Sequence, residues 1–235
     1  MLKPITLVTF LYLLILTTSL HSQPYQIPAD LVAEIKTNQK NVSENPTSPE
    51  AYFDLSMSYA YTGMIERGLS ALGKVKELDP HFDQIVVEKY EKLTKENPKN
   101  WKYWFKLAFG YYFSEPKDRE RSAACFQKII DQNPKHIWAM GYLALLKGDI
   151  ILEEKSRLKE KNQNLDSLAP KYQDVIDLCK KAIEIEPNAT GIHFLLGQAY
   201  FNRGYATDYF SVLGETFIVG KLLKEDKTYY KELGI

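Results

Sequence analysis

An acid or amide followed by proline recurs along this chain and sets where its helices end. The five pairs are Asn45-Pro46, Asp79-Pro80, Asn97-Pro98, Asn133-Pro134 and Glu186-Pro187. Proline has no backbone N–H and disfavours helical geometry in the residue before it, so each pair ends one helix and allows the next to begin. The prolines lie 34, 18, 36 and 53 residues apart. Two of these gaps are close to the length of a helix pair in a repeat protein, so the sequence predicts a stack of helix pairs.

Between the prolines, aromatic and small residues recur at one spacing. The copies are Tyr52-x2-Leu55-Ser56-x2-Tyr59, Trp104-x2-Leu107-Ala108-x2-Tyr111 and, more loosely, His193-x2-Leu196-Gly197-x2-Tyr200. The second helices add Gly68, Leu72 and Val75 before Pro80, and Ser122, Phe126 and Ile129 before Pro134. This pattern resembles the tetratricopeptide repeat (TPR). The resemblance implies an all-α fold, a right-handed superhelical solenoid of antiparallel helix pairs. A generic helical bundle with prolines in its loops is the alternative.

The N-terminal 22 residues form a different kind of segment. Lys3 precedes an apolar run over residues 5–16, and a polar stretch follows over residues 17–23. Such a run is short for a membrane span, which needs roughly 20 apolar residues, and it is typical of a secretory signal peptide. We expect cleavage near Ser22. An uncleaved anchor is the alternative, because Leu20 is large where the cleavage pattern prefers a small residue.

The remaining chain is expected to form one solenoid over residues 29–223, with a C-terminal tail over residues 224–235. The short gap between Pro80 and Pro98 has room for one helix, over residues 84–96, so one first helix is degenerate or missing there. The long gap between Pro134 and Pro187 predicts an insertion over residues 148–170. Its charged composition favours a helical extension and loop that project into solvent.

Composition and motifs exclude several functions. The chain has 30 basic and 30 acidic residues, a balance that attracts neither nucleic acid nor anionic lipid, so we expect no membrane contact beyond the signal segment. The four histidines are scattered, and no metal-binding or phosphate-binding motif occurs. We therefore expect no enzyme, no metal and no cofactor. Cys125 and Cys179 either pair or stay free, and the free form is favoured because Cys179 takes a buried repeat position.

The face left for function is the concave one, which the first helices of a TPR stack line. The side chains predicted for it are Phe53, Met57, Tyr61, Lys102, Phe105, Phe109, Tyr112, Phe113, Leu143, Phe194, Gln198 and Phe201. Aromatic side chains dominate binding hot spots, so this face is predicted to hold an apolar segment of a partner protein or peptide. The alternative is that several of them pack inside the chain, against the helix missing after Pro80 or the terminal segment.

The resemblance and the expected signal peptide together predict a non-enzymatic adaptor that is exported to the bacterial periplasm or cell envelope, or secreted. A structural subunit of an envelope assembly and a regulatory partner of an envelope enzyme are the alternatives. Some TPR proteins hold a terminal carboxylate with basic and amide side chains. Lys102 and Lys106 fit such a clamp, but Phe53 and Met57 stand where it needs a basic residue and an amide. Binding of that type is therefore not expected.

Overall fold

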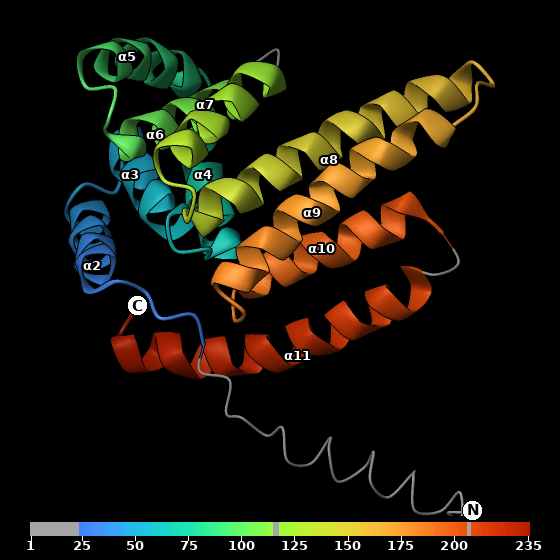
Figure 1. Cartoon of the computed structure of the whole chain (residues 1–235). Coiled ribbons are helices and arrows are strands. Elements are labelled where there is room, and N and C mark those ends of the chain that lie inside the picture. Colours follow the sequence, from blue (N-terminus) through green and yellow to red (C-terminus); the bar gives the residue numbers. More distant parts are fainter. Residues whose placement is uncertain (1–23, 115–117, 206–207) are drawn as a thin grey trace, which may run out of the picture.

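The computed structural model describes residues 24–114, 118–205 and 208–235. Within these ranges all regular secondary structure is helical and no strand occurs. In chain order the helices are α2 (Ala29–Glu44), α3 (Pro49–Ala60), α4 (Ile65–Leu78), α5 (Phe82–Glu96), α6 (Trp101–Phe113), α7 (Arg119–Gln132), α8 (Ile137–Glu160), the 3-10 helix η1 (Asp166–Leu168), α9 (Ala169–Ile185), α10 (Thr190–Arg203) and α11 (Asp208–Leu233) (Figure 1). No helix in the described ranges is long and apolar enough to cross a membrane. The expected signal segment, residues 1–22, lies outside the described residues.

The acid or amide before each proline is where a helix ends. α2, α4, α5, α7 and α9 all stop at the residue that precedes one of these pairs. Side chains then cap several of the helices that follow. The hydroxyl of Ser48 accepts a hydrogen bond from the N–H of Ala51 at the start of α3, and the amide oxygen of Asn100 accepts one from the N–H of Lys102 at the start of α6. These caps satisfy N–H groups that a first helical turn leaves unpaired. The predicted helix ends are confirmed.

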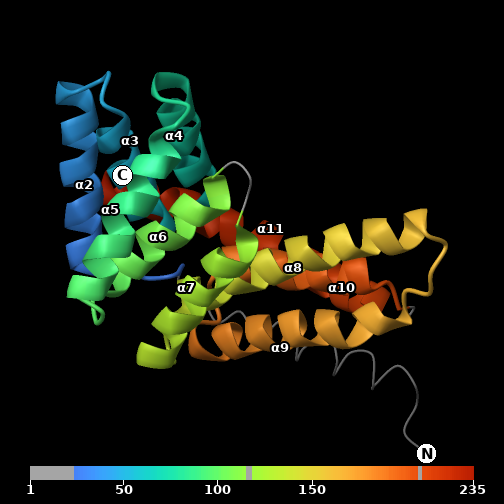
Figure 2. The ribbon, with the colours of Figure 1, turned by 90° about the horizontal axis from the view of Figure 1, so that it is seen from above.

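Helices that are consecutive in the chain pack against each other from α2 to α4 and again from α5 to α11 (Figure 2). Between α4 and α5, packing of this extent is absent in the part of the chain that the structure describes. The fold is therefore an all-α, TPR-like stack of helix pairs, as predicted, with one interruption after α4.

Small residues hold the two best-matched helix pairs close together. The hydroxyl of Ser56 on α3 donates to the carbonyl oxygen of Gly68 on α4 at 3.0 Å, and both residues are buried. In the next pair, the hydroxyl of Ser122 on α7 donates to the carbonyl oxygen of Ala108 on α6 at 2.8 Å. A large side chain at these positions would push the helices apart. The small positions of the repeat pattern thus have the steric role expected of them.

The interruption arises because one helix of a regular stack is missing. After Pro80 the chain turns directly into α5, which packs on α6 as a second helix would. Aromatic side chains from α3 and from Tyr61, the residue after it, fill the space of the missing helix and contact later helices. The ring centroids of Phe53 and Phe82 lie 5.8 Å apart, and those of Tyr61 and Phe105 lie 4.9 Å apart. The single helix predicted between Pro80 and Pro98 is confirmed, and it begins at Phe82.

Two lysines of α6 also form ion pairs with α2 and α3, the helices on the other side of the missing helix. Lys106 Nζ lies 2.6 Å from Asp54 Oδ1 on α3, and Lys102 pairs with Glu34 on α2. Burial of Lys106 opposes its charge, but the adjacent Asp54 carboxylate raises its pKa above the ordinary value. These are the two lysines at positions compatible with a carboxylate clamp. Both are engaged in ion pairs within the chain.

The segment over residues 148–170 is mostly helical. α8 continues without a break to Glu160 and α9 begins at Ala169, so the two form a long hairpin that extends past the neighbouring helices (Figure 2). The hairpin is held to α10, because Lys155 Nζ donates to the carbonyl oxygen of Asn202 at 3.0 Å. The projecting part is therefore a helix pair with a short turn at its tip.

The last helix, α11, takes in residues 224–233, which the sequence assigned to a C-terminal tail. Its first half packs along α10, and a Cβ atom added at Gly197 would lie 3.3 Å from the Cβ of Glu215. Its second half reaches the start of the described chain, where the N–H of Ile27 donates to the hydroxyl of Tyr229 at 3.1 Å. The first and last described parts of the chain therefore lie side by side (Figure 1).

Candidate functional site

The interruption after α4 leaves an apolar groove along the side of that helix. The groove consists of two adjoining cavities of about 310 Å³ and 280 Å³. Four side chains line both cavities, Leu69 and Leu72 from α4 and Phe109 and Phe113 from α6. We refer to the two cavities together as the apolar groove.

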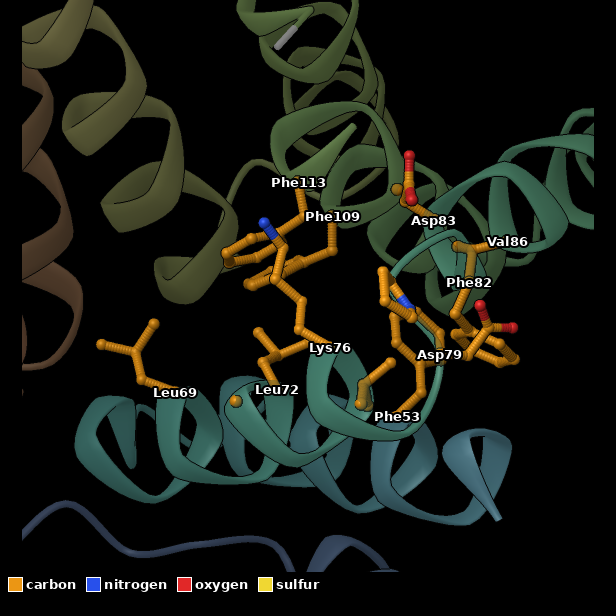
Figure 3. Close-up of a pocket in the computed structure, with 14 residues that line it drawn as sticks. Phe53, Leu69, Leu72, Lys76, Asp79, Phe82, Asp83, Val86, Phe109 and Phe113 are labelled. Atoms are coloured by element: carbon orange, nitrogen blue, oxygen red, sulfur yellow. The ribbon is translucent and has the colours of Figure 1, made fainter. Parts of the chain in front are cut away.

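The first cavity lies between α4, α5 and α6 (Figure 3). Leu72 projects from α4 toward the rings of Phe109 and Phe113 on α6, which stack with their centroids 5.8 Å apart. Asp79 and Asp83 stand at the end of the cavity that faces α5. The cavity is thus mainly apolar, with the amino group of Lys76 from α4 beside the Phe109 and Phe113 rings and the two carboxylates at the end that faces α5.

The second cavity lies between α4, α6, α8 and α10. Its further apolar lining consists of Ala60, Ile65, Phe126, Tyr142, Leu145, Leu146, Phe194 and Leu195. Few polar side chains, Ser56 and Gln198 among them, reach it. Leu69 and Phe194 each keep 53% of their surface exposed, so they form the rim of the groove rather than its floor.

The structure divides the twelve side chains predicted for the concave face into three groups. Those that line the apolar groove are Phe53, Phe109, Tyr112, Phe113, Phe194 and Gln198. Those buried in the core away from its cavities are Met57, Tyr61, Phe105 and Leu143. The other two are Lys102, which is paired with Glu34, and Phe201, which is exposed on α10.

The missing helix explains why the predicted face is split in this way. In a regular stack, α3 and α6 would be separated by a helix, and their inner side chains would face the concave surface. Here α3 meets α6 directly, so Tyr61 packs edge-to-face against Trp101 and Phe105 and becomes buried. Of the predicted side chains on α3 and α6, Phe53, Phe109, Tyr112 and Phe113 line a cavity.

The sequence prediction missed the wall of the groove that α4 supplies. Leu69, Leu72 and Ile65 lie on a second helix, and second helices of a TPR stack normally cover the convex side. The short gap between Pro80 and Pro98 is the signal that points to them, because a missing first helix leaves α4 without its usual neighbour. Leu145 and Leu146 on α8 were missed as well.

The titratable groups do not converge on a reactive centre within the described ranges. No group of three His, Cys, Asp or Glu side chains there could hold a metal ion. Cys125 and Cys179 are free and buried, and burial raises the pKa of each thiol to about 12. The thiolate is the nucleophilic form of cysteine, so these two side chains are poor nucleophiles at neutral pH.

His193 of α10 is the histidine at a repeat position, and it is buried. Its Nδ1 lies 2.6 Å from Glu215 Oε2 on α11, and its Nε2 lies 2.8 Å from the carbonyl oxygen of Pro187. Both partners are acceptors, so only the doubly protonated ring satisfies both contacts. Burial opposes that charge, but the hydrogen bonds to Glu215 and Pro187 prevail and raise the pKa of His193 above its ordinary value.

This arrangement predicts a pH-dependent contribution to stability. Because the folded pKa is raised, charged His193 stabilises the fold fully below the unfolded pKa of about 6.5, and this stabilisation is lost as pH rises through the folded pKa. We expect His193→Gln to reduce the free energy of unfolding by roughly 1–2 kcal/mol at pH 5.5 and by less at pH 9. Urea unfolding at both values measures this. An equal loss at both values would show that the charge of His193 makes no contribution.

No family model and no curated protein matches the sequence. Among solved structures, the chain is similar to MamA. A crystal structure of MamA has a TM-score of 0.39 and 15% identity, and the match covers 84% of this chain and 89% of that one. Another MamA structure has a TM-score of 0.42 and 14% identity, with 84% and 94% covered. These low scores give no correspondence between residues, so the assignment of the fold rests on the helix pairs described above.

Proposed function

We propose that this chain is a non-enzymatic scaffold that holds an apolar segment of a partner protein in the apolar groove. The observation that carries the proposal is the continuous lining of the groove by side chains of α4, α6, α8 and α10. Leu69 and Phe194 remain half exposed at its rim. Apolar concave surfaces of this kind are common binding sites.

The shape of the groove favours a partner that inserts individual side chains. Each cavity has a volume close to the lower end of the range for ligand pockets, roughly 300–1,000 Å³. Leu72, Phe109 and Phe113 lie where the two cavities join. An amphipathic helix, with apolar residues three or four positions apart, offers anchors at a spacing suited to two neighbouring cavities. The proposed ligand is therefore an apolar helical segment of another protein.

The cellular setting of the proposal comes from the sequence. The N-terminal segment has the features of a secretory signal, so we place the scaffold in the periplasm or cell envelope of a bacterium. A partner protein in that compartment could bind the groove directly. Most of the side chains that line the groove are apolar, and its charged residues, Lys76, Asp79 and Asp83, all lie in the first cavity, so apolar contact is the main chemistry that the groove offers.

Capture of the partner from envelope extract tests the proposal. We expect the Leu69→Asp/Phe194→Asp variant to bind the captured protein at least tenfold more weakly than the natural sequence, a loss of about 1.4 kcal/mol or more. The two side chains are half exposed, so the charges should enter the groove without unfolding the chain. Circular dichroism and urea unfolding verify the fold.

Ile85→Asp is the matched control, because Ile85 is also half exposed but lies on α5 outside both cavities. This variant should retain the partner at its original affinity. Equal binding by all three proteins would rule out the groove as the binding site. Equal weakening by both variants would indicate a general effect of the added charge.

A further inference from the structure

The outer face of α11 is apolar although no described part of the chain covers it. Phe210, Leu213 and Phe217 are 78%, 49% and 77% exposed. They follow each other at intervals of three and four residues, so they lie on one side of the helix. We call these three side chains, with Gly214 and Gly220 between and beside them, the α11 face.

The α11 face is unusual for a helix that no later helix of the described chain covers. The last helix of a solenoid normally carries a polar outer side, because no further repeat follows it. In this chain the inner side of α11 is already used, as Leu222 and Asp226 are buried and Asp226 accepts a hydrogen bond from Thr190 at 2.7 Å. One side of α11 therefore packs against the rest of the chain, and the exposed aromatic residues lie on the other side, which faces outward.

The two glycines are a separate observation. A Cβ atom added at Gly214 or at Gly220 would meet no atom within 4 Å, so neither glycine is required by packing within the described chain. Glycine in the interior of a helix costs roughly 0.5–1 kcal/mol relative to alanine. Small residues on an outward helix face let the backbone of another helix approach closely.

The size and spacing of the α11 face fit a second copy of the chain. Tyr209, which precedes Phe210 and is 63% exposed, extends the apolar surface of the α11 face, and with it the exposed side-chain surface is roughly 500 Å². Two such faces bury roughly 1,000 Å², the area at which a specific protein interface begins. Phe210 and Phe217 also lie two helical turns apart with Gly214 between them, so a twofold axis near Gly214 places each phenylalanine opposite the other phenylalanine of the second copy.

We propose that the chain forms a homodimer in which the α11 faces of two copies pack antiparallel about this axis. The apolar groove lies on other helices, between α4, α6, α8 and α10, so the dimer leaves it open. A dimer would present two grooves and bind a partner with two matching segments more tightly than one copy does.

Sedimentation velocity over a range of protein concentrations tests the dimer. The natural sequence should sediment at twice the protomer mass, and Phe210→Ser/Phe217→Ser should raise the dissociation constant of the dimer at least 100-fold. Ile85→Ser on α5 is the matched control for loss of an exposed apolar side chain, and it should remain dimeric. The groove variant Leu69→Asp/Phe194→Asp should also remain dimeric, so failure of groove binding is distinguishable from failure of this proposal.

Cross-linking gives a readout that does not depend on removing apolar surface. Gly214→Cys should form a disulfide between two copies on mild oxidation, because the proposed axis passes beside this residue. Gly148→Cys on α8, another open glycine, should not. The native Cys125 and Cys179 are buried and do not compete.

The N-terminal residues are the rival occupant of the α11 face, since the described chain begins at Pro24 beside Lys221 and Lys224 of α11. The experiment is therefore performed on the full chain and on residues 24–235, with the fold of the latter verified by circular dichroism. Dimers of both forms support the proposal. A monomer of either form at all concentrations, or a dimer that persists in Phe210→Ser/Phe217→Ser, overturns it.

Discussion

Phe105→Ala should lower the free energy of unfolding by about 3–5 kcal/mol, because it opens a cavity at the centre of the molecule. Phe105 is fully buried. Its ring centroid lies 4.9 Å from that of Tyr61 just after α3, 5.1 Å from that of Phe126 on α7 and 5.4 Å from that of Tyr142 on α8. One ring thus joins helices on both sides of the interruption, and neighbouring helices cannot close over the space without disturbing these contacts.

Urea unfolding followed by circular dichroism measures the loss. Phe201→Ala is the matched control, since it removes the same ring from an exposed position on α10 and should change stability by no more than about 0.5 kcal/mol. A loss below about 1.5 kcal/mol for Phe105→Ala would show that the helices on either side of the interruption are held together by other contacts.

Gly63→Ala should destabilise the chain by about 2–5 kcal/mol for two reasons. Gly63 has a φ of 75°, a left-handed conformation that costs a residue with a Cβ atom roughly 1–2 kcal/mol. A Cβ atom at this position would also lie 2.0 Å from Cη2 of Trp138, and relieving such a clash costs a further 1–3 kcal/mol or so. Trp138 is buried and packs edge-to-face on Tyr25, so it has little freedom to move away.

Gly204→Ala separates the two causes, because Gly204 has the same φ of 75° but its added Cβ atom would lie 3.9 Å from the carbonyl oxygen of Phe201, an ordinary van der Waals distance. This control should lose only the roughly 1–2 kcal/mol of the backbone conformation. Thermal and urea unfolding of both variants give the difference. Equal losses would mean that Trp138 adjusts to the methyl group at no cost.

Much of the fold follows from local features of the sequence. The prolines end helices through the geometry of a single residue, and the small positions, such as Ser56 and Ala108, act through contacts within one helix pair. Interactions of this kind depend only on neighbours in the chain. The all-α stack, its interruption near Pro80 and the extended helix before Pro170 were therefore within reach of a sequence argument.

The candidate site was less predictable because it depends on how the stack continues across the interruption. The sequence placed Phe53, Met57 and Tyr61 on the concave face. That prediction is correct only if every repeat is rotated by the same angle relative to the repeat before it. Contact between α3 and α6 changes that rotation, buries Met57 and Tyr61 and turns Leu69 of α4 toward the open side. The sequence alone contains no local pattern that fixes this contact.

The C-terminal helix shows a second reason for the difference. The sequence assigned residues 224–235 to a C-terminal tail, after a stretch in which Gly214 and Gly220 interrupt the apolar residues. The remaining residues of α11 favour a helix strongly enough to continue through both glycines. Contacts with α10 fix which side of α11 faces the core. His193 contacts Glu215, and Thr190 donates a hydrogen bond to Asp226.

The contact between Ile27 and Tyr229 has a consequence for how the chain folds. The two residues are separated by 202 positions, whereas most contacts in a stack of repeats join neighbours in the chain. A chain that becomes free to fold from its N-terminus onward can assemble α2 to α10 in order, but Tyr25 and Ile27 lack part of their native surroundings until α11 is also free to fold. Closing so long a loop is slow compared with forming a helix pair. We therefore expect the contact between Ile27 and Tyr229 to form late in folding, after the helix pairs that it encloses.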